Sequence, residues 1–89
     1  MSETQEVELQ ELTTKGQQLV DEVRDMMKNR TYDFDLTVKM ELKNSCKEIE
    51  RYISKVSGGK GKEKHVKHLQ KIIQHLETIV QGLVAYYSR

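Results

Sequence analysis

The apolar residues of the C-terminal third repeat with a spacing that only an α-helix brings onto one face. Seven of them alternate at steps of three and four without a break: Val66, Leu69, Ile73, Leu76, Val80, Leu83 and Tyr87. Because an α-helix has about 3.6 residues per turn, this spacing predicts one long apolar stripe. The stripe widens to an arc of about 160° through Ile72, Ile79, Val84 and Tyr86. Such an arc needs two neighbouring helices to cover it, from the same chain or from a second subunit.

The N-terminal third shows the same alternation, which predicts another amphipathic helix. Its stripe consists of Leu9, Leu12, Gly16, Leu19, Val23 and Met26, widened by Val20 and Met27. Ser2 and Gln5 have the spacing of a capping box, and the glutamates that follow lie where the helix dipole favours negative charge. We therefore predict a helix over roughly residues 3–29.

The middle of the chain contains two different patterns. Helical spacing links Leu42, Cys46, Ile49, Ile53 and Val56 and stops at Ser57-Gly58-Gly59, which predicts a helix end. Before it, residues 32–42 alternate between apolar and polar side chains, a pattern typical of a β-strand. A lone strand cannot satisfy its backbone hydrogen bonds, so this interpretation requires pairing with the same strand of a second copy.

The alternative for residues 32–42 is a helix that begins after Asp33 or Asp35 as its N-cap. Val38 would then join the stripe of the second helix, while Leu36 and Met40 would lie on its outer face. We favour the helix because Lys, Glu and Met are good helix formers and because an intermolecular ribbon is rarer. Both interpretations leave apolar side chains exposed in this region.

Three helices joined by short connections predict an all-α fold, an antiparallel three-helix bundle with up-down-up topology. The length of 89 residues suits one helical-bundle domain over residues 1–89, which could also assemble into an oligomer. One cysteine and the lack of a signal-peptide pattern favour a cytoplasmic location. No stretch approaches the ~20 consecutive apolar residues of a membrane span.

The predicted bundle leaves some apolar residues without a place in its core. They lie at the start of the second helix and near the C-terminus, where we expect Tyr32, Phe34, Leu36, Met40, Tyr86 and Tyr87, with Ala85 beside them, to bind a partner. Exposed apolar side chains usually mark a contact surface, and a tyrosine ring at its rim keeps a polar end free to bond. We therefore expect a non-catalytic module for protein–protein interaction or self-assembly. Its partner would be a second copy of the chain or another helical protein.

The alternative function is polyanion binding by a ridge of lysines on the third helix. Lys60, Lys64, Lys67 and Lys71 follow one another at steps of four, three and four, and would form a ridge about 16 Å long. Such a ridge could bind the phosphates of nucleic acid or of anionic lipid. Along the chain, however, no arginine or aromatic residue lies among these lysines to stack on bases or read them. Glutamates near the N-terminus are also expected at the same end of the bundle, where they would balance this charge.

The remaining polar motifs predict no enzyme activity, cofactor or metal. Gly61-Lys62 is not followed by the Ser or Thr of a phosphate-binding loop, so residues 58–62 are interpreted as a turn between helices. His65 and His68 are one helical turn apart, but His75 lies further along and no other metal ligands accompany them.

His68-Leu69-Gln70-Lys71 resembles the start of the His-x-x-Lys-Gly motif of histidine phosphotransfer domains, which are also helical bundles. The resemblance implies a phosphoryl-accepting role for His68, although Ile72 stands where that motif has Gly. Cys46 lies on the apolar stripe and is expected to be a buried thiol. Gly16 also lies on a stripe, where a close approach of two helices would explain it, whereas Gly82 lies off the stripe of the third helix.

Overall fold

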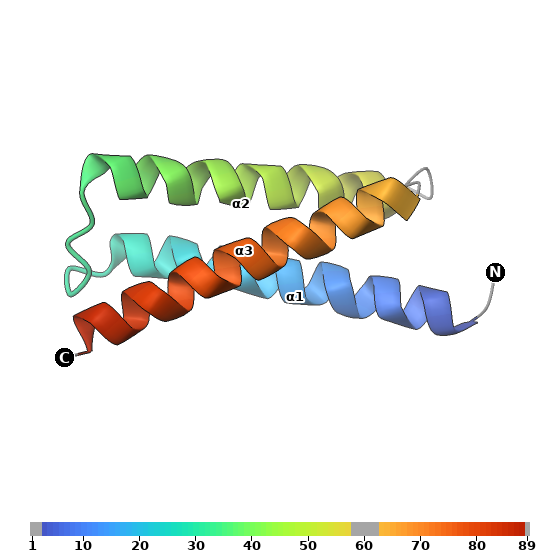
Figure 1. Ribbon diagram of the computed structural model, residues 1–89, viewed down its shortest axis with the longest axis horizontal. Coiled ribbons are helices and arrows are strands. Elements are labelled where there is room, and N and C mark those ends of the chain that lie inside the picture. Colours follow the sequence, from blue (N-terminus) through green and yellow to red (C-terminus); the bar gives the residue numbers. More distant parts are fainter. Residues whose placement is uncertain (1–2, 58–62, 89) are drawn as a thin grey trace.

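The protein is an all-α three-helix bundle. The computed structural model describes residues 3–57 and 63–88, with side chains described from residue 8 onward. Its elements are α1 (Glu3–Lys28), α2 (Leu36–Ser57) and α3 (Glu63–Tyr87). α1 and α3 run in the same direction with α2 antiparallel to both, and each helix packs against the other two (Figure 1). The bundle is elongated, with principal extents of 46 × 21 × 17 Å. The predicted fold class is confirmed.

α1 ends at Lys28, one residue before the predicted boundary, and a short turn closed by backbone hydrogen bonds follows it. The amide of Asn29 still donates to the carbonyls of Asp25 and Met26. The amide of Tyr32 then donates to the carbonyl of Asn29, whose side chain accepts from the Thr31 amide at 3.0 Å. The chain therefore reverses within a few residues and returns as α2. Ser2 of the predicted capping box lies outside the described residues.

The helical interpretation of residues 36–42 is confirmed and the strand interpretation is wrong, because α2 begins at Leu36 and the described residues contain no strand. Asp35 is the N-cap. Its carboxylate accepts from the Val38 amide at 2.9 Å, and its carbonyl accepts from the Lys39 amide at 3.0 Å. These bonds satisfy amides that a helix start otherwise leaves without a partner. Local capping thus decides between two patterns that periodicity alone could not separate.

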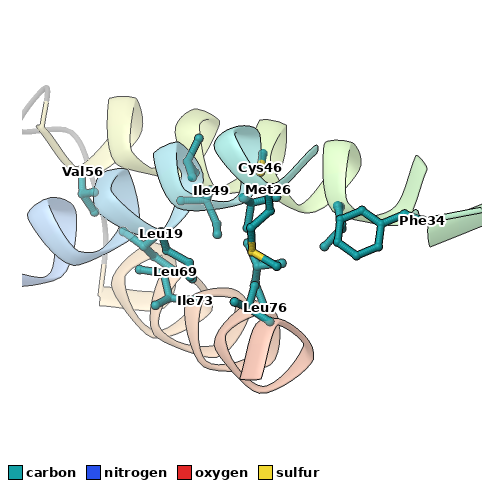
Figure 2. Close-up of a cluster of buried hydrophobic side chains, with 13 residues drawn as sticks. Leu19, Met26, Phe34, Cys46, Ile49, Val56, Leu69, Ile73 and Leu76 are labelled. Carbon is teal, nitrogen blue, oxygen red and sulfur yellow. The ribbon is translucent and has the colours of Figure 1, made fainter. Parts of the chain in front are cut away.

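The three apolar stripes cover one another to form a single core. Its buried members are Leu19, Val20, Val23, Met26, Phe34, Leu42, Cys46, Ile49, Val56, Leu69, Ile73, Leu76 and Val80. Figure 2 shows this core as a row of side chains that runs from Val56 at one end to Phe34 at the other. Removing this apolar surface from water is the main stabilising term of such a fold, at roughly 25 cal/mol per Å². Val38 packs against the same core, as its register predicts.

Candidate interaction surfaces

An aromatic cluster closes the end of the bundle where α2 begins and α3 ends. The rings of Tyr32 and Phe34 stack with their centroids 5.6 Å apart, and Tyr87 of α3 meets them edge-on at 5.5 and 5.6 Å. The Tyr87 hydroxyl donates to the carbonyl of Asp33 at 2.9 Å. Burial raises the pKa of this hydroxyl above its ordinary value. The cluster therefore joins the α1–α2 connection to the last turn of α3.

This cluster corrects one sequence-based expectation. Phe34 was expected at the surface, but its side chain is only 4% exposed, so that expectation is wrong. The physical reason is that residues 32–35 precede α2 in a non-helical linker, which turns the ring onto the core instead of around a helix. Tyr32 and Tyr87 are half-buried against the same core. Their role in binding a partner stays a prediction.

Among the side chains that the structure describes, three large apolar ones are exposed: Leu36 at 73%, Tyr86 at 65% and Met40 at 55%. We call these residues the exposed apolar trio. Leu36 and Met40 are four residues apart and share one face of α2, as the sequence predicts. Tyr86 meets Tyr87 edge-on at 5.1 Å, so it borders the aromatic cluster. The first turn of α2 and the last turn of α3 lie at the same end of the bundle (Figure 1).

At the opposite end, polar and aromatic side chains connect α2 to α3. Nε2 of His68 lies 2.8 Å from a carboxylate oxygen of Glu48. The centroid of the Tyr52 ring lies 4.5 Å from that of His68 and 5.9 Å from that of His65, which is three residues earlier on α3. The ammonium of Lys55 lies 4.8 Å above the same tyrosine ring. Tyr52 is thus the centre of a small cationic and aromatic cluster.

The described lysines of the predicted ridge are exposed on α3. They are Lys64, Lys67 and Lys71, and Lys60 lies outside the described residues. Lys67 forms an ion pair with Glu63 at 3.6 Å, one turn earlier on the same helix. The expected charge balance with the N-terminus is not visible as ion pairs, because neither Glu8 nor Glu11 pairs with a described cation.

The α2 cations beside this ridge were missed by reasoning along the chain. Lys47, Arg51 and Lys55 are spaced four residues apart on α2, and Lys47 and Arg51 are exposed. α2 packs against α3 in the opposite direction, so the end of α2 lies beside the start of α3 (Figure 1). The spacing of these cations was visible in the sequence, but the pairing of the end of α2 with the start of α3 was not.

The cysteine and two of the histidines lie in different environments. The Cys46 side chain is 2% exposed, and burial raises the pKa of its thiol, which disfavours the reactive thiolate. His75 is exposed on α3, and His68 is paired with Glu48. Within residues 3–57 and 63–88, no group of three or more His, Cys, Asp and Glu residues is arranged to hold a metal ion.

Comparisons of this chain with protein-family models, with curated proteins and with solved structures find no match. In the described part of the chain, no helix combines the length and the apolar character that crossing a membrane would require.

Proposed function

We propose that this protein is a non-catalytic helical interaction module that self-associates through the exposed apolar trio. The observation on which the proposal rests is the exposure of Leu36, Met40 and Tyr86 at one end of a bundle whose other large described hydrophobic residues are buried or half-buried. Exposed apolar surface of this kind is removed from water when a partner covers it.

A second copy of the chain is the partner that we favour. In a dimer with two-fold symmetry the same residues meet on both subunits, so an apolar trio on one copy covers the equivalent trio on the other. Tyr86 suits the rim of such an interface because its ring contributes contact area while its hydroxyl can remain in water. The aromatic cluster beneath supports the trio, because Tyr87 holds the last turn of α3 against the α1–α2 connection.

The test is to measure molecular mass by light scattering after size exclusion, over concentrations up to about 1 mM. We expect a mass above that of the 10.4 kDa monomer, rising with concentration. The double variant Leu36→Asp with Met40→Asp should return the protein to a monomer, because two charges cannot be buried in an apolar contact without a partner. Its helicity by circular dichroism should stay that of the native chain, since both side chains are exposed.

The matched control adds the same two charges, at the same spacing, elsewhere. Thr14→Asp with Gln18→Asp changes two exposed residues of α1 that lie outside the trio. This control should keep the mass of the native protein. A native chain that stays monomeric at every concentration would overturn the proposal, as would equal loss of mass in both variants.

A further inference from the structure

The positive charge of the chain is concentrated in one segment. Residues 43–71 contain nine Lys and Arg against three Glu, whereas residues 1–42 contain five Lys and Arg against ten Asp and Glu. The net charge of +1 therefore conceals a strong separation of charge. The described part of this segment comprises α2 from residue 43 onward and the first nine residues of α3. The end of α2 and the start of α3 lie at the end of the bundle opposite the exposed apolar trio (Figure 1).

The three glutamates of this segment already have partners. Glu48, Glu50 and Glu63 pair with His68, Arg24 and Lys67, respectively. Six cations of the segment, in contrast, form no ion pair with any residue that the structure describes: Lys43, Lys47, Arg51, Lys55, Lys64 and Lys71. Lys43 lies only three residues after Met40, so we call the other five residues, together with Lys67, the basic surface. Most of these cations are therefore available to bind an anionic ligand from outside the chain.

No arginine or aromatic residue lies among the ridge lysines along the chain, but α2 contributes both residue types to this end of the bundle. α2 brings the Tyr52 ring to within 4.5 Å of the His68 ring on α3, and Arg51 and Lys55 lie on the part of α2 that packs against the start of α3. The ammonium of Lys55 lies 4.8 Å from the centroid of Tyr52, so a cationic side chain covers one face of this ring. Proteins that bind single-stranded nucleic acid combine cations, which contact the phosphates, with an aromatic ring on which a base stacks. Tyr52 is the ring of this region, and it lies tilted against His68.

We propose that the basic surface binds the phosphate backbone of single-stranded nucleic acid, with one base stacked over Tyr52 in place of the Lys55 side chain. An anionic membrane would attract the same charges, but its binding is strengthened by apolar side chains that insert beside them. The exposed large hydrophobic residues of the described chain are Leu36, Met40 and Tyr86, all at the other end of the bundle. The surface therefore matches a nucleic acid strand better than a lipid bilayer.

The first test is the fluorescence anisotropy of labelled oligo(U) and oligo(dT) of about 12 nucleotides, titrated with the native protein. Contact of about five cations with phosphates gives a slope of about −3.5 for the logarithm of affinity against the logarithm of salt concentration. Raising the salt from about 50 mM to about 200 mM should then weaken binding about 100-fold. Vesicles that contain phosphatidylserine, tested at the same salt, should bind more weakly than the oligonucleotides.

The second test changes three cations of the basic surface without changing the fold. The triple variant Lys47→Gln, Arg51→Gln and Lys71→Gln keeps good helix formers at exposed positions and should reduce the salt slope by about 2. Its matched control is Lys28→Gln, Arg30→Gln and Lys39→Gln, which removes the same charge from exposed residues at the opposite end. The control should keep most of the affinity and the native slope.

The third test separates stacking from charge. Tyr52→Leu should weaken oligonucleotide binding about tenfold and leave the salt slope unchanged, because the substitution removes a stacking ring and no cation. Tyr52→Phe keeps an aromatic ring at the same position and should retain most of the affinity. Circular dichroism confirms that each variant is folded.

Three results would overturn the proposal: no binding to either oligonucleotide at low salt, equal losses in the triple variant and its control, or stronger binding to the vesicles. None of them concerns the apolar trio. The proposed self-association is judged separately, by the mass of the Leu36 and Met40 variant.

Discussion

At the scale of single residues, Gly16 shows how a missing side chain allows the helices to pack. It is buried on the core face of α1. A Cβ at this position would lie 3.0 Å from Ile73, 3.1 Å from Ile53 and 3.2 Å from Ile49. These distances are shorter than ordinary van der Waals contact, so α1 approaches both other helices closely at this point. Gly82 differs, because nothing lies within 4 Å of a Cβ added there.

The two glycines therefore form a matched pair for mutation to alanine. Each substitution should gain about 1 kcal/mol of helix propensity. For Gly82→Ala we expect this full gain in the free energy of unfolding. For Gly16→Ala we expect a net loss of about 1 kcal/mol, since crowding of a packed core costs about 1–3 kcal/mol. Urea unfolding followed by circular dichroism measures both. Equal stabilisation by the two substitutions would show that the close approach at Gly16 has no energetic consequence.

The hydroxyl of Tyr87 gives the protein a pH dependence with a definite sign. Burial raises its pKa in the folded state above the ordinary value of 10.0. Below that value the hydroxyl is protonated in both states. As the pH rises beyond it, the unfolded chain releases this proton first, so the contribution of Tyr87 to stability is lost. The loss is complete above the raised pKa of the folded state.

We therefore expect the midpoint of thermal unfolding to fall as the pH rises above about 10. The midpoint of the Tyr87→Phe variant should fall less steeply over the same range. This variant should also be less stable than the native chain at neutral pH, because the hydrogen bond to the Asp33 carbonyl is lost. The native chain, measured over the same pH range, gives the reference profile. If Tyr87→Phe also followed that profile unchanged, another group would have to account for the alkaline loss.

At the scale of elements, the start of α2 depends on Asp35. The carboxylate of this residue accepts the amide proton of Val38, which no carbonyl within the helix can accept. Asp33, two residues earlier, contributes its backbone carbonyl to Tyr87, so its own carboxylate can be removed without breaking that bond.

The cap can be tested by comparing the two aspartates. Asp35→Ala should lower the free energy of unfolding by about 1 kcal/mol, since a helix N-cap is lost. The free energy of unfolding of Asp33→Ala should stay within about 0.5 kcal/mol of the native value, because the Asp33 side chain is exposed and forms no capping hydrogen bond. Chemical denaturation of both variants checks the difference. A larger cost for Asp33→Ala than for Asp35→Ala would contradict the assignment of the cap.

At the scale of the whole molecule, the two ends of the rod differ in chemistry. One end has the exposed apolar trio above an aromatic cluster, and the other has the basic surface around Tyr52. The ion pairs that join α1 to the other helices, Lys15–Glu77 and Arg24–Glu50, involve partly exposed side chains, so they contribute little to stability. The packed core connects the two ends, and the proposed partners would bind at opposite ends of the same rod.

The sequence by itself determined the three helices, their core faces and the exposure of Leu36 and Met40. Each of these follows from a periodicity of side chains relative to their own helix axis, which is a local property. The buried position of Cys46 and the close approach at Gly16 were predicted in the same way.

The tertiary structure alone decided the environment of residues that lie between helices or belong to two of them. Phe34 is buried because a linker without helical register can turn its ring onto a core that distant residues build. Tyr52 lies against His65 and His68 because α2 runs antiparallel to α3 and packs against it, so residues distant along the chain come together. Periodicity describes one helix at a time, whereas the burial of a linker residue and a surface shared by two helices depend on how the helices pair.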